Sequence, residues 1–307
     1  MIAFVFPGQG AQAVGMGKAL ADRFEICAKT FAEADAALGE PLSELIFNGP
    51  MDRLTLTENT QPAILTMSVA VCRLLGQQGL TPSYVAGHSL GEYSAHVAAG
   101  TLQFADAVRL VRNRGRYMQE AVPVGAGAMA AILGLDEAGV NQACEEAAQG
   151  EVVSAANLNG AGQIVIAGTA AAVARASERA KALGAKRAIP LPVSAPFHCA
   201  LMKPAEVRLT PELRAVPAAD PRVPVVANVD AEPKRTAAAS IDALIKQIAS
   251  PVRWEQVVQR LASEGVTRYV EVGPGKALSG MIKRIASGAT IQNVEGPDDL
   301  AAIEARS

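Results

Sequence analysis

Three short apolar segments, at 2–6, 83–86 and 267–272, each run directly into a turn that contains glycine, and helical periodicity follows. A strand that leads through a tight turn into a helix is the building unit of a parallel sheet with helices on its faces. Since this unit recurs near both ends of the chain, it limits the fold more than any other feature. We therefore predict an α/β fold with a parallel sheet, whose helices include 60–75 and 104–120.

The middle of the chain has a different order of elements. Its apolar patterns predict strand 128–133, helix 136–148, strand 152–158, strand 163–167, helix 170–183 and strand 186–189. The order βαββαβ is typical of a ferredoxin-like domain. Because both flanks have the α/β pattern, we predict that residues 124–194 form a small domain inserted into a catalytic domain made of residues 1–123 and 195–307. A cleft between the two domains is the expected ligand site.

Composition limits the partners. Of the 307 residues, 50% are hydrophobic, so the chain can bury a large core. The 28 Lys and Arg residues nearly balance the 30 Asp and Glu residues, which gives no overall attraction to nucleic acid or to an anionic membrane. The uncharged stretch between Glu151 and Arg175 is too polar for a membrane span. We expect a soluble, cytoplasmic protein that acts on a small molecule or on another protein.

The four cysteines are widely separated along the chain and show no C-x-x-C spacing: Cys27, Cys72, Cys144 and Cys199. Such scattered cysteines are typical of buried free thiols rather than of a metal site or a disulfide framework. We therefore predict no metal centre.

The sequence from Gly87 to Gly91 matches G-x-S-x-G and lies between a predicted strand and a predicted helix. In that context the glycines permit a sharp turn that exposes the Ser89 hydroxyl above the sheet. The amide of Leu90 and the start of the helix can stabilise negative charge beside it. The motif also arises by chance as a structural turn, but its position favours a nucleophile.

A nucleophilic serine needs a base, and the chain has only three histidines. His88 adjoins Ser89 within the turn, so its side chain should point away from the hydroxyl and bond within the scaffold. His96 lies two helical turns beyond Ser89, about 10 Å along the axis, which is too far for proton transfer. His198, in an irregular segment just after the small domain, is therefore the predicted base.

The loop after the first strand permits two interpretations. Gly8, Gly10 and Ala13 formally satisfy the G-x-G-x-x-A dinucleotide fingerprint, which would indicate a nicotinamide-dependent oxidoreductase. Gln9 suits instead a loop that faces a reacting oxygen, and its amide could complete an oxyanion hole with that of Leu90. An oxidoreductase would leave the serine turn unexplained.

Four arginines lie on the predicted helix 104–120. Arg109, Arg112 and Arg116 share one face and have no evident internal partner, so they form either a solvated face or a surface that attracts an acidic partner. Arg114 points elsewhere. From spacing alone it is equally a surface residue or a cleft residue that grips a carboxylate with two hydrogen bonds.

Five segments, in order along nearly the whole chain, resemble the malonyl-CoA:acyl carrier protein transacylases of bacterial fatty-acid synthesis: PGQGAQ from Pro7, GHSLGE from Gly87, RGRYMQEA from Arg114, PFHCALM from Pro196 and EVGPGKAL from Glu271. The resemblance implies an α/β-hydrolase-like large domain with a ferredoxin-like small domain. It also implies ping-pong transfer from malonyl-CoA through a malonyl-serine ester to the phosphopantetheine thiol of an acyl carrier protein, by a monomer without a cofactor of its own.

Catalytic roles carry over by position. The resemblance implies that Ser89 is the nucleophile, that His198 is the base, and that the amides of Gln9 and Leu90 form the oxyanion hole. In this family a backbone carbonyl orients the histidine in place of an aspartate, and Gln247 occupies that position.

Substrate-binding roles carry over in the same way. Arg114 matches the clamp on the malonyl carboxylate, and Asn157 and Asn159 match small-domain residues near the acyl-CoA. His88 is placed among the residues that border the substrate. Phe197 stands where relatives carry serine, and a bulky aromatic residue there accompanies a preference for malonyl over methylmalonyl groups. A hydrolase that releases the acyl group to water stays open as an alternative, because the motifs do not identify the acceptor.

Overall fold

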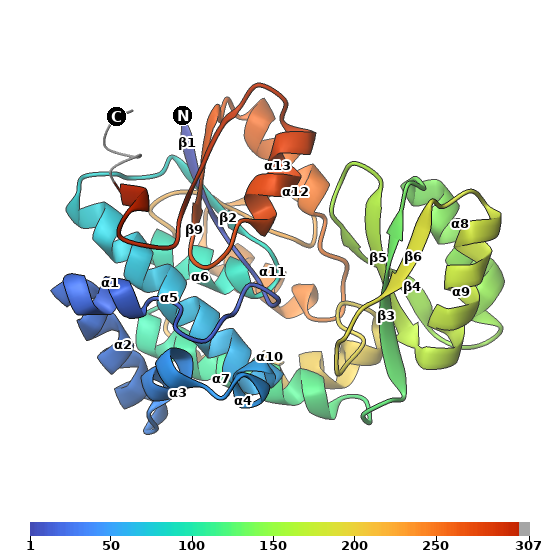
Figure 1. The fold of residues 1–307 in the computed structure, drawn as a ribbon, viewed down its shortest axis with the longest axis horizontal. Coiled ribbons are helices and arrows are strands. Elements are labelled where there is room, and N and C mark those ends of the chain that lie inside the picture. The colour runs from blue at the N-terminus through green and yellow to red at the C-terminus, as the bar shows by residue number, and fades with distance from the viewer. Residues whose placement is uncertain (301–307) are drawn as a thin grey trace.

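The computed structural model describes residues 1–300, which form two β-sheets and the helices that cover them (Figure 1). The larger sheet has the strand order β10-β9-β1-β2-β7-β8. These strands are β1 (Ile2–Phe6), β2 (Tyr84–Gly87), β7 (Val225–Val226), β8 (Pro233–Lys234), β9 (Arg268–Val272) and β10 (Thr290–Val294). Every pairing is parallel except that of β8 with β7. The predicted parallel sheet is therefore confirmed, and the predicted strands correspond to β1, β2 and β9.

Alternate residues of β1 contribute to two separate hydrophobic cores. Phe4 and Phe6 lie in the core on one face of the sheet, whereas Ala3 and Val5 lie in the core on the other face. Successive side chains of a strand point to opposite faces, so a strand buried on both faces is apolar throughout. This explains why IAFVF shows no polar alternation.

The helices divide between these two faces. The first face is covered by α1 (Lys18–Arg23), α2 (Glu25–Leu38), α3 (Leu42–Asn48), α4 (Met51–Thr55), α5 (Thr57–Gln77), α6 (Leu90–Ala99), α7 (Phe104–Glu120), the 3₁₀ helix Ala200–Met202, α10 (Lys203–Ala215) and α11 (Ala237–Gln247). The second face is covered by α12 (Trp254–Ser263) and α13 (Ala277–Ile285). No helix within residues 1–300 is long and apolar enough to cross a bilayer.

The smaller sheet comes from the middle of the chain and has the order β4-β5-β3-β6, antiparallel throughout. Its elements are β3 (Gly127–Leu133), α8 (Glu137–Ala148), β4 (Val153–Leu158), β5 (Gln163–Thr169), α9 (Ala170–Ala182) and β6 (Arg187–Pro190). This is the predicted βαββαβ order. Asp136 and Thr169 each cap the helix that follows with a side-chain oxygen.

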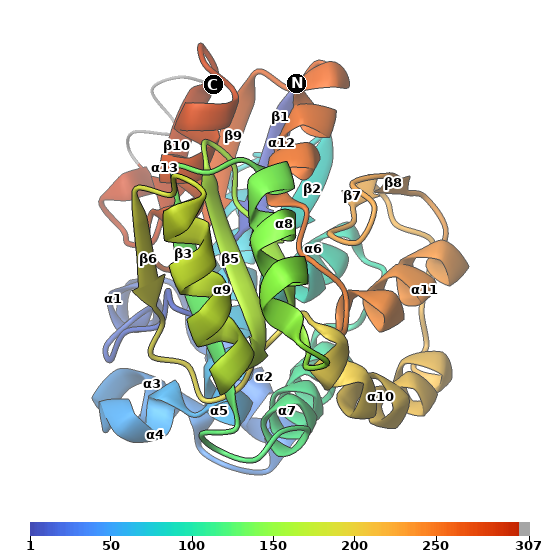
Figure 2. The ribbon, with the colours of Figure 1, turned by 90° about the vertical axis from the view of Figure 1, so that its right-hand side faces the viewer.

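The two faces of the smaller sheet have different environments. Ala130 and Ile132 pack beneath α8 and α9, which cover the outer face (Figure 2). Met129 and Ala131, which alternate with them, belong to the core of the larger sheet. The backbone connects the two parts as well, because Val252 N donates to Ala156 O at 2.8 Å. The inner face of the smaller sheet therefore lies against the carboxyl ends of β1 and β2.

Candidate active site

The turn between β2 and α6 holds Ser89 in a strained conformation. Ser89 has φ 52° and ψ −107°, a backbone state that side-chain-bearing residues rarely adopt. A Cβ on Gly87 would lie 2.0 Å from the carbonyl carbon of Gly91, and a Cβ on Gly91 would lie 2.0 Å from the Phe6 oxygen. Only glycine fits at either position, so the close packing of β1, β2 and α6 fixes the turn that presents the hydroxyl.

His198 lies directly beside the Ser89 hydroxyl. Its Nε2 lies 2.6 Å from Ser89 Oγ, and its Nδ1 lies 3.1 Å from the carbonyl oxygen of Gln247. Because a carbonyl can only accept, Nδ1 carries the proton and Nε2 accepts from the serine. Burial, with a smaller contribution from the nearby Arg114 charge, lowers the pKa of His198 to about 3. The imidazole is therefore neutral, and free to accept a proton, at neutral pH.

Arg114 approaches the same hydroxyl from α7. Its Nη2 donates to Ser89 Oγ at 3.1 Å and to Gln247 Oε1 at 2.9 Å, while its Nη1 donates to Gln61 Oε1 at 2.8 Å. The side chain is 2% exposed. Within residues 1–300 it makes no ion pair with a carboxylate, and its Nε has no hydrogen-bond partner. The cleft thus contains a buried guanidinium whose charge is not neutralised by direct contact with an acidic side chain.

A network beneath the serine was missed by the sequence analysis. Asn228 Oδ1 accepts from the amide of Ser89 at 2.7 Å, and its Nδ2 donates to Gly87 O at 2.7 Å. Glu92 Oε2 accepts from the amide of Asn228 and from Nε2 of Gln247, each at 2.9 Å. Glu92, Asn228 and Gln247 are fully buried. These bonds fix the backbone of the turn and the orientation of the Gln247 amide.

These missed residues differ in how visible they are in the sequence. Glu92 is the last residue of GHSLGE, and a charged residue on an apolar helix was a signal that could have been followed. Gln61 lies among other buried polar residues of α5, including Asn59 and Thr60, so the sequence does not single it out. Asn228 lies in a loop just after β7 and has no local pattern. Only the folded chain identifies it.

Two backbone amides face the site from different loops. Gln9 and Leu90 both line the cavity in front of Ser89. Neither amide donates to a protein acceptor within residues 1–300. Leu90 is also the first residue of α6, whose amino-terminal end favours negative charge. An oxyanion that develops beside Ser89 could accept hydrogen bonds from both amides.

The cavity has a volume of about 130 Å³, and its walls include the loops that follow β1 and β2 and part of the smaller sheet. Residues of the smaller sheet line it alongside the loop residues Phe197 and His198: Met129 from β3, Asn157 from β4 and Val165 from β5. Phe197 is 9% exposed, and its ring narrows the space next to the base. Asn157 Oδ1 is buried without a hydrogen-bond partner, so it can accept a bond from a ligand.

His88 and Asn159 bond to each other rather than to Ser89 or His198. His88 lines the cavity, but its Nε2 lies 3.0 Å from Asn159 Oδ1 and its ring packs against Trp254 at 5.7 Å. Asn159 does not line the cavity, and it is 4% exposed. In this structure the Asn159 side-chain oxygen bonds to His88, and its place near the acyl-CoA stays a prediction. His96 lies fully buried beside Glu92, away from the serine.

The first loop does not have the geometry of a dinucleotide site. After Gly10 the chain continues without a helix until α1 begins at Lys18, and the residue before that helix is Gly17. The dinucleotide fingerprint requires a helix that starts within the motif, because its amide groups bind the pyrophosphate. The oxidoreductase alternative therefore lacks its structural basis.

The expectation that three arginines of α7 lack internal partners is wrong. Arg109 donates to Asp106 at 2.8 Å, Arg112 pairs with Glu40, and Arg116 donates to Asn113 at 3.1 Å. Asp106 and Asn113 lie one turn earlier on α7, and Glu40 lies in the turn that follows α2. The three charges are largely neutralised or bonded locally, so they do not form a free basic patch.

Together these groups can perform acyl transfer. A serine with a neutral imidazole base and two convergent amides is suited to a nucleophile that forms an ester intermediate. Within residues 1–300 no cluster of His, Cys, Asp and Glu side chains could hold a metal ion. The buried guanidinium next to the serine favours an acyl group that carries a second, anionic end.

Comparison with known proteins was made on this basis. The model of the acyl transferase domain family matches residues 3–294. The malonyl CoA-acyl carrier protein transacylase of Escherichia coli (strain K12) is 54% identical over 301 residues, which cover 98% of this chain and 97% of that protein.

Solved structures agree over the same length. An acyl carrier protein S-malonyltransferase from Vibrio cholerae O1 biovar eltor superposes with a TM-score of 0.97 at 49% identity, covering 98% of this chain and 99% of that one. A malonyl-transacylase in complex with a type II polyketide acyl-carrier protein has a TM-score of 0.97 at 47% identity, covering 100% of this chain and 99% of that one.

Proposed function

This chain belongs to the acyl transferase domain family and, within it, to the malonyl CoA-acyl carrier protein transacylases, and from that premise we propose how its own residues perform the transfer. The substrate is malonyl-CoA and the acceptor is the phosphopantetheine thiol of an acyl carrier protein. One observation carries the assignment of the acyl group. The buried Arg114 guanidinium lies 3.1 Å from Ser89 Oγ and has no carboxylate partner of its own within residues 1–300.

The first half of the reaction loads the serine. Ser89 Oγ forms a bond to the thioester carbon while its proton passes to Nε2 of His198, which is 2.6 Å away. The carbonyl oxygen becomes an oxyanion that accepts from the amides of Gln9 and Leu90. When the tetrahedral intermediate collapses, the carbon–sulfur bond breaks, and the coenzyme A sulfur takes the proton from His198. The product is a malonyl ester on Ser89.

The second half reverses these roles with a new thiol. The phosphopantetheine thiol gives its proton to His198, attacks the ester carbon, and releases Ser89, which recovers the proton. The Gln247 carbonyl accepts from Nδ1 at 3.1 Å and stabilises the imidazolium in both halves. No aspartate is needed, because a backbone carbonyl provides the orientation.

The malonyl carboxylate would accept hydrogen bonds from the Arg114 guanidinium. An ester on Ser89 extends two carbons to its free carboxylate, which is short enough to reach a guanidinium that already bonds to the serine oxygen. Gln61 and Gln247 hold the guanidinium from the other side, at 2.8 and 2.9 Å. The donors are thus oriented before the substrate enters. Phe197 closes the wall next to the base, which supports a preference for malonyl over the bulkier methylmalonyl group.

We further propose that residues 1–123 and 195–307 form an α/β-hydrolase-like domain and that residues 124–194 form a ferredoxin-like domain inserted into it. The strand order β4-β5-β3-β6 with two helices on one face supports the second assignment. Action as a monomer, in the cytoplasm and without a cofactor of its own remains a prediction from the sequence.

The decisive experiment combines the protein with malonyl-CoA and a phosphopantetheinylated acyl carrier protein. Intact-mass spectrometry should show a malonyl adduct on the enzyme, and then malonyl-carrier once the acceptor is added. Ser89→Ala should form no adduct, since no other strained nucleophile lies in the cleft. Free malonate as the main product would favour a hydrolase, and an adduct on Ser89→Ala would refute the assignment of the nucleophile.

A further inference from the structure

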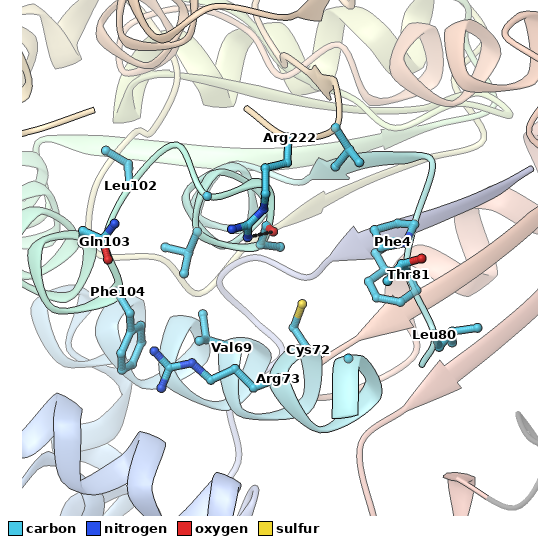
Figure 3. Close-up of a pocket in the computed structure, with 16 residues that line it drawn as sticks. Phe4, Val69, Cys72, Arg73, Leu80, Thr81, Leu102, Gln103, Phe104 and Arg222 are labelled. Carbon is cyan, nitrogen blue, oxygen red and sulfur yellow. Dashed lines mark hydrogen bonds between the residues drawn. The ribbon is translucent and has the colours of Figure 1, made fainter. Parts of the chain in front are cut away.

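Figure 3 shows the residues that line a second cavity, of about 540 Å³. This cavity lies at the opposite end of the larger sheet from the active site. It is bordered by Phe4 of β1, by the loop that leads into β2, and by Val223 just before β7. Both loops enter the sheet at the amino ends of their strands, whereas Ser89 follows the carboxyl end of β2. None of its lining residues lines the active-site cavity. It is therefore a separate space.

Small side chains leave this cavity open. Cys72 and Gly76 come from α5, Ala98 comes from the end of α6, and Gly100 directly follows that helix. Larger apolar side chains form the rest of the wall: Phe4, Val69, Leu80, Val97, Leu102, Phe104 and Val223. The volume lies within the range of ligand sites, about 300 to 1,000 Å³, and a mostly apolar wall is typical of them.

The charged groups of the lining are all positive. They are Arg73 and Arg222, and no carboxylate lines the cavity. Arg73 is already engaged, because it bonds to Glu33 at 2.7 Å and to Thr30 at 3.0 Å and stacks on the Phe104 ring. The guanidinium of Arg222 donates only a 3.3 Å bond, to the Ala98 carbonyl, and makes no ion pair within residues 1–300. Arg222 thus retains donors for an anion.

Figure 3 shows how these groups are arranged. Arg222 extends from the strand-entry side toward α5, on which Cys72 and Arg73 lie. Burial raises the pKa of the Cys72 thiol to about 12, while the charges of both arginines act in the opposite direction. The thiol therefore stays protonated at neutral pH and acts as part of the apolar wall. An amphipathic anion matches this combination of a long apolar wall with one available guanidinium.

We propose that this cavity binds a medium-chain aliphatic monocarboxylate, with the tail against the apolar wall and the carboxylate on Arg222. The site is independent of the malonyl-transfer chemistry. Gly76 lies about 22 Å further along α5 than Gln61, which contacts Arg114, at 1.5 Å per residue. Filling the cavity at Gly76 should therefore leave malonyl transfer unchanged.

Titration calorimetry with sodium octanoate tests the proposal. The filling variant is Gly76→Phe, because a Cβ at Gly76 meets no atom within 4 Å and the residue does not require a positive φ. Gly280→Phe is its matched control, since Gly280 is also an exposed glycine inside a helix with open space around its Cβ but lies on α13. Cys72→Phe fills the same cavity from a second position. Melting temperatures verify that each variant is folded.

The wild type and Gly280→Phe should bind octanoate with equal affinity, and Gly76→Phe and Cys72→Phe should lose at least tenfold. Arg222→Gln should weaken octanoate about tenfold, the usual loss of a charge-assisted hydrogen bond. Octan-1-ol, which has no charge, should bind the wild type more weakly than octanoate does. Its affinity should not change in Arg222→Gln. Unchanged octanoate affinity in both filling variants, no binding to the wild type, or octanol as tight as octanoate would each overturn the proposal.

Discussion

Replacing Arg114 with alanine should change which acyl group the enzyme accepts. The variant removes a guanidinium that is 2% exposed and that bonds to Ser89, Gln247 and Gln61. A malonyl group that enters this cleft would leave its carboxylate buried without a charged partner. An acetyl group has no carboxylate to lose. The two substrates should therefore respond differently to the same substitution.

The size of the effect follows from the burial of the pair. Removing one partner of a buried ion pair costs about 3–5 kcal/mol, because the other charge is left desolvated. At about 1.4 kcal/mol per factor of ten, kcat/KM for malonyl-CoA should fall by about 10² to 10⁴. Part of that fall comes from the loss of the bond between Arg114 and Gln247, which should also lower kcat/KM for acetyl-CoA. The ratio of the two losses therefore isolates the carboxylate contact.

The assay measures kcat/KM for malonyl-CoA and for acetyl-CoA with the same carrier protein and at the same ionic strength. Arg109→Ala is the matched control, because it removes the same charge from α7 at an exposed position paired with Asp106. Arg114→Lys should recover little malonyl activity, since an ammonium group cannot make the two parallel bonds of a guanidinium. If both substrates fall by the same factor in Arg114→Ala, Arg114 is structural and the carboxylate clamp is refuted.

Three further predictions concern the surroundings of the serine. Burial holds the pKa of His198 at about 3, so lowering the pH through 6.5, the usual pKa of histidine, should not reduce the rate of malonyl-adduct formation through this residue. His198→Ala should suppress the adduct at every pH. Near-normal acylation by that variant would exclude His198 as the base. Burial raises the pKa of Glu92 to about 7, so the adduct rate should instead decline modestly as pH falls through 7 and the carboxylate that orients Gln247 and Asn228 is protonated. Glu92→Gln should lack that decline and lower kcat more than it changes KM, whereas the same pH profile in both proteins would assign the titration elsewhere. Phe197→Ser should enlarge the cavity and raise the ratio of methylmalonyl to malonyl transfer, as measured by competition between the two thioesters, and an unchanged ratio would remove Phe197 from substrate selection.

The sequence alone was sufficient for part of the elements, because their patterns are local, whereas the short strands β7 and β8 and the edge strand β10 were not predicted. The apolar segments that became β1, β2 and β9, the βαββαβ order of the middle, and helix α7 with its bounds are all local patterns. Each such pattern depends on hydrophobic periodicity and turn residues that lie within a few positions of one another in the sequence. The serine turn was predictable for the same reason, because both of its glycines lie within five consecutive positions.

The choice of His198 as the base combined local sequence information with a contact that is distant in the sequence. Only three histidines were available, and two of them were excluded by their spacing from Ser89 along the chain. The remaining residue, His198, lies 2.6 Å from the hydroxyl, although 109 residues separate the two. Because the chain has only three histidines, this long-range contact could be predicted by elimination.

Tertiary structure decided which side chains meet. Asn228 and Glu92 join the network beneath the serine, and their partners are far apart in sequence, which no local pattern records. The arginines of α7 could not be told apart by their sequence pattern alone. In the structure Arg112 pairs with Glu40 from the turn after α2, whereas Arg114 points inward and pairs with no carboxylate within residues 1–300. The direction and the neighbours of a side chain depend on how helices pack against each other, and that packing is a property of the whole core.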